Sequence, residues 1–259
     1  MTLDPTEAAS LLAAACRDRR TLDRFSDTHE GIDEAWGHAV QDVDRARRHS
    51  AGERLVGAKL GLTSEAKQRA MGVRQPIVGF LTDAMTVGQL DLATLAQPRV
   101  EPEIAFRLGV DLDRAITAEE VWEVVDAVAP ALEILDSRWT GYRFRLGDVL
   151  ADNTSAAGFV VGEWQPVDAS TADALLARAA TFAVDDVVVA TTSPAAILGD
   201  PALAVVHLAR HLERRGETLP AGSIVLAGAM SDAVPMERGA VFELAVEGLG
   251  TARLAVDLG

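Results

Sequence analysis

Two glutamates, Glu101 and Glu103, stand one residue apart in the apolar segment 98–106. In a β-strand, residues i and i+2 point to the same face, so the two carboxylates would project side by side with their Cα atoms about 6–7 Å apart. Two ionised carboxylates in that arrangement repel each other unless one is protonated or a cation lies between them. The spacing is therefore typical of a metal site, although a solvated strand face would show the same pattern.

A third carboxylate, Glu133, lies within a second apolar segment, 130–135. A lone carboxylate in such a segment needs a partner. Three carboxylates without a neighbouring histidine or cysteine favour a hard cation, so we expect Mg²⁺ or Mn²⁺ to be bound by Glu101, Glu103 and Glu133. Pro102 cannot donate to a sheet ladder, which predicts a sheet edge or an open mouth beside these ligands.

Further polar groups could complete such a site. Lys59 stands between glycines and apolar residues, and a buried lysine can act as an acid or a base, although a surface lysine fits the same pattern. Arg138 could bind a carboxylate through two hydrogen bonds or form a structural salt bridge. The segment 152–155 is either a plain turn or a source of substrate contacts from Asn153 and Ser155.

The composition narrows the class of protein. The chain has 259 residues, 49% of them hydrophobic and 24% charged, as in ordinary globular proteins. A net charge of −15 argues against nucleic acids and anionic membranes as partners, because both require a basic surface. A small anionic substrate stays compatible, since a metal ion can reverse the local field. With one cysteine and no apolar run near the ~18 residues of a membrane span, we expect a cytoplasmic protein.

The elements that must position these residues follow from hydrophobic periodicity and capping patterns. Helices are predicted over residues 4–20, 30–48, 64–71, 117–129 and 200–215. Strands are predicted over 55–62, 78–81, 98–108, 130–136, 158–162, 180–190 and 223–229, with a hairpin at the C-terminus. This order predicts an α+β fold in which an N-terminal helical segment, 1–54, precedes a catalytic domain of mixed sheet, 55–259.

Six motifs, taken together, resemble a known family. In order they are GAKLGLTS (57–64), MGVRQPIVGFL (71–81), PRVEPEIAF (98–106), PALEILDSR (130–138), ADNTS (151–155) and AGAMSDAVPM (227–236). They are similar to those of the 2-oxopent-4-enoate hydratase and 4-oxalocrotonate decarboxylase family, within the fumarylacetoacetase-like superfamily. The resemblance covers nearly the whole chain from about residue 50.

The resemblance implies a rolled, mixed β-sheet domain with Mg²⁺ or Mn²⁺ held by the three glutamates. It implies that Lys59 is the acid or base near the metal and that Ser155 and its neighbours contact substrate. It also implies a small anionic 2-oxo acid substrate from the meta-cleavage degradation of aromatic compounds. Members of the family form homo-oligomers, and the decarboxylases associate with a partner hydratase.

One loop position bears on which reaction the chain performs. Hydratases of this family commonly have GVDQPDFG where this chain has GVRQPIVG, so Ile77 replaces an aspartate that assists hydration. This favours decarboxylation of 4-oxalocrotonate (2-oxo-3-hexenedioate) to 2-hydroxypenta-2,4-dienoate, with hydration of the latter compound as the alternative. We rank lower a carbon–carbon hydrolase, which would need a base such as His29, His38 or His49, and a non-catalytic assembly partner.

Overall fold

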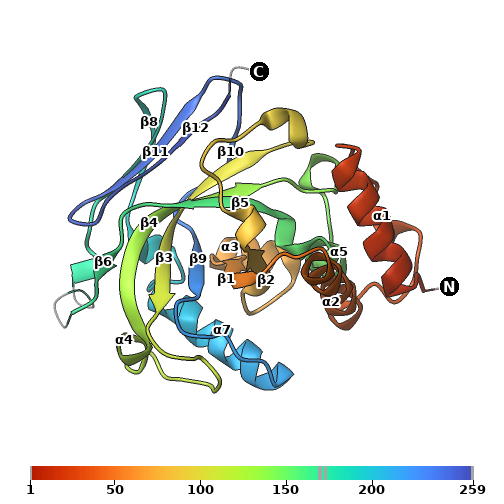
Figure 1. Ribbon diagram of the computed structural model, residues 1–259, viewed down its shortest axis with the longest axis horizontal. Coiled ribbons are helices and arrows are strands. Elements are labelled where there is room, and N and C mark those ends of the chain that lie inside the picture. Colours follow the sequence, from red (N-terminus) through yellow and green to blue (C-terminus); the bar gives the residue numbers. More distant parts are fainter. Residues whose placement is uncertain (1, 169–170, 172–173, 258–259) are drawn as a thin grey trace.

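The computed structural model describes residues 2–168, 171 and 174–257. Two helices come first, α1 (Pro5–Arg17) and α2 (Glu34–Ser50), and in Figure 1 they lie together at one side of the molecule. The Asp4 carboxylate caps α1 by accepting hydrogen bonds from the first-turn N–H groups. Both helices share one apolar cluster with Trp139 and Ala151, so the N-terminal segment packs against the rest of the chain. The boundary at residue 54 stays a prediction.

Within the described residues, the main sheet has eight strands, with the path β2-β1-β9-β3-β4-β5, while β10 pairs with β3 and β6 pairs with β4. Strands β1 and β9 are parallel, and the other neighbours are antiparallel. Figure 1 shows a curled layer, not a flat one. The strands are β1 (Leu55–Gly61), β2 (Ile77–Thr82), β3 (Arg99–Leu108), β4 (Val125–Leu135), β5 (Ala156–Val161), β6 (Gln165–Pro166), β9 (Ile224–Ala229) and β10 (Val234–Pro235).

A second sheet of four strands has the order β12-β11-β7-β8. Its strands are β7 (Ala180–Val184), β8 (Val187–Thr192), β11 (Val241–Val246) and β12 (Gly250–Ala255). The single strand predicted over 180–190 is therefore wrong: the chain turns back at Asp185 and Asp186. Both residues have positive φ, 49° and 64°, as a two-residue hairpin loop requires.

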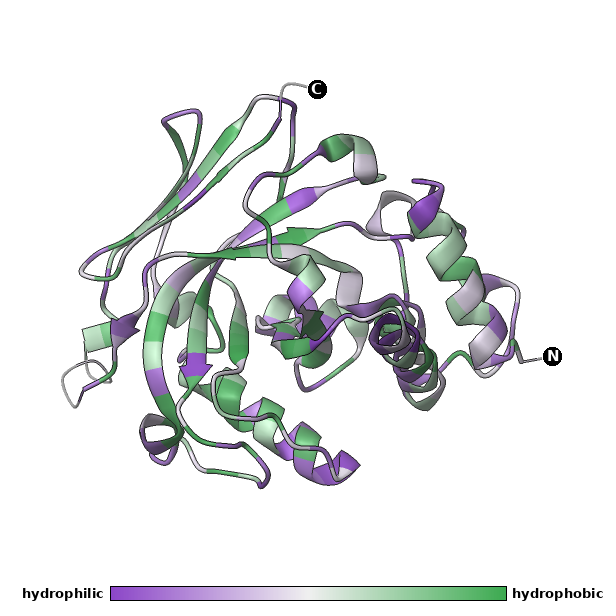
Figure 2. Ribbon diagram, viewed as in Figure 1, coloured by the Kyte–Doolittle hydropathy of each residue, from purple (hydrophilic) through white to green (hydrophobic). Residues whose placement is uncertain are grey.

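The main core lies between the two sheets and α7 (Ala202–Arg215). Figure 2 shows hydrophobic residues along β9 and on one side of α7, where these elements meet. Two shorter helices, α3 (Glu65–Met71) and α5 (Leu146–Ala151), flank the strands that form the site described below. Among the described residues, no helix is both long enough and apolar enough to cross a membrane. The predicted α+β class with a mixed, curled sheet is confirmed.

The helix predicted over 117–129 is largely wrong. The capping pattern does form, since Thr117 N–H donates to Glu120 Oε2 at 2.7 Å, but the helix that follows, α4, covers only Val121–Val124. From Val125 onward the chain pairs with β3 along its whole length as β4. Long-range pairing with β3 overrides the local helical pattern, and the β-branched valines of this segment favour the strand.

The sheet edge predicted at Pro102 is also wrong, because β3 is an interior strand with β4 on one side. On the other side, β9 pairs with β3 from Glu103 onward, and β10 pairs with Val100 and the residue before it. Pro102 lies between these two partners, and Met230 N–H donates to its carbonyl at 2.8 Å. The missing proline N–H thus falls at a break between neighbouring strands.

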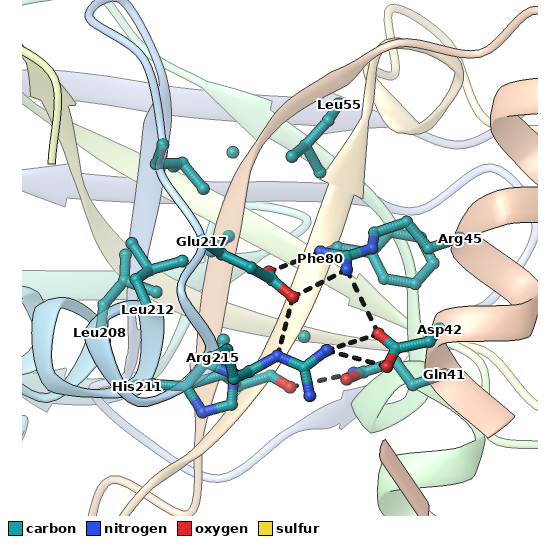
Figure 3. A pocket seen from close by; sticks show the side chains of 15 residues that line it. Gln41, Asp42, Arg45, Leu55, Phe80, Leu208, His211, Leu212, Arg215 and Glu217 are labelled. Atoms are coloured by element: carbon teal, nitrogen blue, oxygen red, sulfur yellow. Dashed lines mark hydrogen bonds and ion pairs between the residues drawn. The ribbon is translucent and has the colours of Figure 1, made fainter. Parts of the chain in front are cut away.

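A charged network joins α2 to the segment after α7. Glu217 accepts hydrogen bonds from Arg45 at 2.7 Å and 2.9 Å, and from Arg215 at 2.9 Å. Asp42 in turn accepts from Arg215 at 2.6 Å (Figure 3). The network lies beside His211, whose ring is 5.2 Å from that of His38 on α2. These contacts tie the N-terminal helices to the sheet domain.

Candidate metal centre

Three carboxylates converge on the inner side of the curled sheet. Glu101 and Glu133 are direct partners across β3 and β4, and Glu103 follows two residues along β3. Each offers an oxygen, and the three oxygens lie within 4.8 Å of one another. Glu103 and Glu133 are fully buried, while Glu101 retains 9% exposure. The sequence prediction that Glu101 and Glu103 share a strand face therefore matches their positions, and the pairing of β3 with β4 brings Glu133 beside them.

The carboxylate oxygens are poorly satisfied within the protein. Gly228 N–H donates to Glu103 Oε2 at 2.9 Å, and Lys59 Nζ lies 3.0 Å from Glu133 Oε1. Among the described residues, Glu103 Oε1 and Glu133 Oε2 have no hydrogen-bond partner. A buried carboxylate oxygen without a partner is costly, and a bound cation is the usual compensation.

The charges in this space do not balance without an ion. Burial raises the pKa of Glu103 well above its ordinary value, and the charge of Glu133 raises it further. Burial also raises the pKa of Glu133, although the Lys59 ammonium opposes that rise. Three carboxylates face two ammonium groups, those of Lys59 and Lys67, so one negative charge has no counterpart. A bound cation would compensate the carboxylates, and an all-carboxylate donor set suits Mg²⁺ or Mn²⁺.

Lys59 reaches this centre from β1, three strands away from β4 in the sheet order. Its side chain is 3% exposed, and its ammonium also donates to the Thr154 carbonyl at 3.3 Å. Burial lowers the pKa of Lys59, but the nearby carboxylates, Glu133 foremost, outweigh burial and raise it. Lys59 is thus a buried, protonated group beside the carboxylates, and not a surface lysine.

A cavity of about 480 Å³ opens from these groups toward solvent. Lys59 and Glu101 lie in its wall, together with Lys67 of α3, which is 3.2 Å from Glu101 Oε1. One side of the cavity is apolar and belongs to a packed cluster. The side chains of that cluster that line the cavity are those of Leu62, Met71, Ile77, Phe144 and Val149.

Glycines keep this space open. A Cβ on Gly61 would lie 3.1 Å from Ile77 Cγ1 and 3.7 Å from Lys59 Nζ, so any side chain there would fill the gap between them. Gly228 has φ of 116°, and a Cβ there would lie 2.2 Å from Thr63 Oγ1. Glycine at 228 therefore allows the backbone to pass close to Thr63 while its N–H donates to Glu103.

The predicted contacts in segment 152–155 separate into two groups. Asn153, Thr154 and Ser155 all have positive φ, a conformation that costs energy in residues with side chains. Ser155 and Thr154 line the cavity, and Thr154 Oγ1 is buried without a hydrogen-bond partner among the described residues. Asn153 instead bonds the backbone of Phe80 in both directions, at 2.9 Å each, and does not line the cavity.

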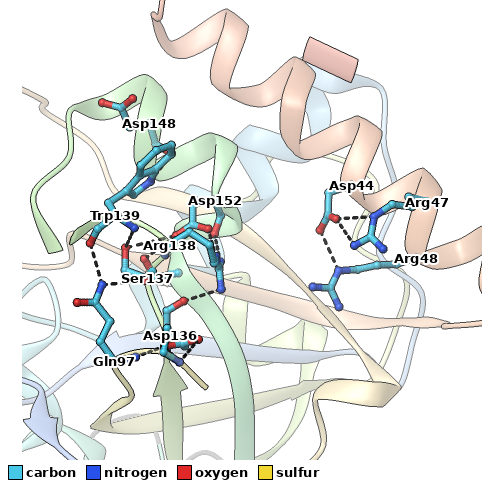
Figure 4. A network of polar contacts seen from close by, with 12 residues as sticks. Asp44, Arg47, Arg48, Gln97, Asp136, Ser137, Arg138, Trp139, Asp148 and Asp152 are labelled. Atoms are coloured by element: carbon cyan, nitrogen blue, oxygen red, sulfur yellow. Dashed lines mark hydrogen bonds and ion pairs between the residues drawn. The ribbon is translucent and has the colours of Figure 1, made fainter. Parts of the chain in front are cut away.

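Arg138 does not line the cavity either. Arg138 is buried, and its guanidinium pairs with Asp152 and donates to the Asp152 carbonyl at 2.8 Å (Figure 4). Its backbone N–H donates to Asp152 Oδ2 at 3.0 Å. The hydrogen-bond donors of Arg138 are thus used within the protein. This agrees with a structural salt bridge, the second of the two interpretations of Arg138 drawn from the sequence. We therefore take neither Arg138 nor Asn153 further as a substrate contact.

Four polar residues in the cavity wall were missed from the sequence: Arg99, Lys67, Tyr142 and Asp232. Arg99 precedes Glu101 by two residues on β3, so the same alternation that groups the glutamates places it on their face. Lys67 belongs to α3, which has no buried residue of its own. Tyr142 lies in an irregular turn, and no sequence pattern indicated its contact with Arg99.

Comparison with known proteins agrees with this geometry. Residues 59–257 match the model of the family described as fumarylacetoacetate (FAA) hydrolase C-terminal. The chain is 44% identical over 215 residues to a 4-oxalocrotonate decarboxylase of a Pseudomonas species, covering 82% of both chains. It is 38% identical over 255 residues to a 2-keto-4-pentenoate hydratase of Paraburkholderia xenovorans (strain LB400), covering 95% of this chain and 93% of the other.

A solved structure is also similar over its full length. The 4-oxalocrotonate decarboxylase from Pseudomonas putida G7, complexed with magnesium and adipate, superposes with a TM-score of 0.92. It is 30% identical in sequence, and the match covers 98% of this chain and 99% of that one. The resemblance proposed from the six motifs is thereby confirmed.

Proposed function

This chain belongs to the fumarylacetoacetate hydrolase C-terminal family, and on that premise we propose that it is a divalent-metal-dependent lyase acting on a small 2-oxo acid. The reaction we propose is decarboxylation of 4-oxalocrotonate, the substrate named for two of its relatives. The metal would be Mg²⁺ or Mn²⁺, held by Glu101, Glu103 and Glu133. Hydration of 2-hydroxypenta-2,4-dienoate is the second candidate, since hydratases are also among the relatives.

The observation that most supports a metal-dependent lyase is the contact between a buried carboxylate triad and a buried ammonium at one cavity wall. Lys59 Nζ is 3.0 Å from Glu133 Oε1, beside carboxylate oxygens that lack partners among the described residues. A metal bound there would polarise the 2-oxo group as a Lewis acid. Lys59 would face the same oxygen and hold a proton for it.

The proposed step balances with these residues. The C5–C6 bond of 2-oxo-3-hexenedioate breaks, and carbon dioxide leaves. The electron pair moves through the conjugated chain to the 2-oxo oxygen, which takes a proton from the Lys59 ammonium and gives 2-hydroxypenta-2,4-dienoate. A charged donor in a buried site stabilises charge where it develops, which is the main source of acceleration in such reactions.

The apolar wall favours decarboxylation over hydration. Ile77 lies next to Gly61 and Lys59, and its neighbours along the cavity are Met71 and Val149. Hydration needs a group that orients a water molecule, and these side chains have no such group. Surrounding a carboxylate with carbon instead disfavours the charged form and favours loss of neutral carbon dioxide.

Two further candidates have less support. Carbon–carbon hydrolysis needs a base to activate water, yet none of the candidate bases His29, His38 and His49 lines this cavity. His38 packs instead against His211, and His29 against Phe25. A non-catalytic assembly partner would have no need to retain a buried triad with partnerless oxygens, whose burial costs stability.

Homo-oligomerisation, association with a partner hydratase and a cytoplasmic location complete the proposal. Support for assembly comes from β8, an edge strand on which Val187, Val188 and Val189 are 65%, 56% and 48% exposed. An exposed apolar edge strand offers unpaired backbone groups and apolar side chains to which another chain can bind. Light scattering of the purified protein tests the homo-oligomer, with a monomer as the contradicting result.

The reaction is tested by incubating the protein with 2-oxo-3-hexenedioate and Mg²⁺ while carbon dioxide is measured. We expect release that stops with a strong chelator and returns with excess Mg²⁺. If no carbon dioxide appears, but 2-hydroxypenta-2,4-dienoate is converted to 4-hydroxy-2-oxopentanoate, the chain is a hydratase instead.

A further inference from the structure

We propose that Arg99 binds the 1-carboxylate of the 2-oxo acid and thereby determines which way the substrate lies in the cavity. This inference rests on the proposed function, because it needs a 2-oxo acid beside Lys59. It adds a substrate-binding residue that the sequence motifs did not indicate, and it assigns the two ends of the substrate to two walls of the cavity.

Among the described residues, Arg99 is the cation in this cavity wall that forms no ion pair with a carboxylate, although Asp232 lines the same cavity. Lys59 pairs with Glu133 at 3.0 Å, and Lys67 pairs with Glu101 at 3.2 Å. Among the described residues no carboxylate forms an ion pair with Arg99, although its side chain is half-buried in the cavity wall. A half-buried guanidinium without an anionic partner is a ready site for a carboxylate ligand.

The guanidinium is held in place by an aromatic ring. Arg99 Cζ lies 4.5 Å from the centre of the Tyr142 ring, which also lines the cavity. Tyr142 is fixed in turn, because its hydroxyl donates to the Gln97 carbonyl at 3.1 Å. Stacking on a ring occupies the face of a guanidinium and leaves its N–H edge available. Tyr142 is therefore a positioning residue for Arg99.

The position of Arg99 along β3 suits the carboxylate next to the keto group. Arg99 and Glu101 point to one face, and their Cα atoms are about 6–7 Å apart. Lys59 contacts Glu133, which is paired with Glu101 across β3 and β4, so a keto oxygen that faces Lys59 lies beside the triad. The 1-carboxylate, which is bonded to the keto carbon, then lies toward Arg99, and the remaining carbons lie toward the wall that contains Ile77.

This orientation agrees with the chemistry of decarboxylation. An ion pair between an arginine and the carboxylate that leaves would stabilise the starting state and oppose its loss. Binding of the 1-carboxylate has no such cost, since that group keeps its charge throughout. The distal carboxylate would then face Ile77, Met71 and Val149, which cannot stabilise its charge.

The test measures binding of two inert ligands to the Mg²⁺-loaded protein by calorimetry. 2-Oxohexanoate has only the 1-carboxylate, and 2-oxoadipate adds a distal carboxylate but lacks the double bond needed for decarboxylation. We expect Arg99→Ala to weaken the binding of both ligands by the same factor, about 10- to 100-fold, as for loss of a charged pair of hydrogen bonds. Arg99→Lys keeps the charge, so its affinity for each ligand should lie between those of the wild type and Arg99→Ala.

Arg107→Ala is the matched control. Arg107 lies on the same strand and its guanidinium is 5.5 Å from the centre of the Trp164 ring, but it pairs with Asp126 at 2.7 Å and does not line the cavity. The Arg107→Ala variant should bind both ligands with the affinity of the wild type. If Arg99→Ala does not fold, Arg99→Lys still decides the question, because a substrate contact predicts weaker ligand binding at an unchanged melting temperature.

The outcomes separate this inference from the proposed function. If the wild type binds neither ligand, the proposed function fails. If the wild type binds both ligands and Arg99→Ala weakens the binding of 2-oxoadipate alone, then Arg99 contacts the distal carboxylate and the inferred orientation is overturned. Unchanged binding of both ligands by the folded variant overturns the contact itself.

Discussion

Lys59 and Glu133 contact each other at 3.0 Å although they belong to β1 and β4, which are separated by two strands of the same sheet. In a flat sheet these strands would be about 14 Å apart, too far for the two side chains to meet. The curl of the sheet closes that distance and brings an ammonium to a cluster of carboxylates. The acid of the proposed reaction is thus positioned by the shape of the sheet.

Lys59→Met tests the role of this ammonium. We expect the rate of carbon dioxide release, kcat, to fall at least about 100-fold, which is the usual effect of removing an acid or base. Mg²⁺ affinity should stay equal or increase, because a cation that competes for Glu133 is removed. Calorimetric titration with Mg²⁺ distinguishes this from loss of the site, and a variant with wild-type kcat would contradict the assignment.

Ile77→Asp tests the apolar wall. The new carboxylate would introduce a charge and attract water at a wall that consists of apolar side chains in the wild type. We therefore expect the rate of carbon dioxide release to fall about 10-fold or more. Burying the new group, at a position now 8% exposed, should also lower the melting temperature. Ile77→Val serves as the control and should keep the activity. Undiminished carbon dioxide release from the folded aspartate variant would remove the argument for decarboxylation.

Arg138→Ala tests whether Arg138 is structural. Removing one partner of a buried ion pair leaves the Asp152 carboxyl buried without its partner, so we expect the free energy of unfolding to fall by about 3–5 kcal/mol. The KM of the folded fraction should not change, since Arg138 does not line the cavity. Urea denaturation and steady-state kinetics measure the two effects. An increase in KM at unchanged stability would restore Arg138 as a substrate contact.

Glu217→Gln tests the network between α2 and α7 through its pH dependence. Hydrogen bonds from Arg45 lower the pKa of Glu217 to about 2, from an ordinary value of 4.5. A lowered pKa stabilises the fold above pH 4.5, and this contribution is lost as the pH falls toward 2. We expect the variant to be less stable than the wild type by about 1–2 kcal/mol at pH 7, after screening by solvent.

The difference in the free energy of unfolding between Glu217→Gln and the wild type should shrink as the pH is lowered from 5 toward 3. Urea denaturation over that range measures it. A difference that stays constant with pH would mean that the charge of Glu217 does not contribute, and that the substitution acts through packing alone.

The parts of the site that depend on local alternation could be predicted from the sequence. Glu101 and Glu103 share a face because of the two-residue period of a strand, and the strand of Glu133 was recognised from its apolar neighbours. Arg99 obeys the same period and could have been found by extending it two residues.

Long-range features could not be predicted in this way. The partner of Arg138 is decided by where segment 152–155 returns, and no local pattern distinguishes Asp152 from a ligand. The helix predicted over 117–129 was largely wrong because β3 pairs with much of that segment. This pairing depends on residues about 20 positions earlier in the chain, which a local pattern does not include. The contact of Lys59 with Glu133 likewise depends on the curl of the whole sheet.

The location of the metal is the central claim, and anomalous diffraction from crystals soaked in Mn²⁺ tests it most directly. We predict one strong peak among Glu101, Glu103 and Glu133, with an oxygen of each at about 2.0–2.3 Å. The peak should be absent from crystals of Glu103→Gln that retain the same fold. A peak elsewhere, or none in the wild type at saturating Mn²⁺, would contradict the account.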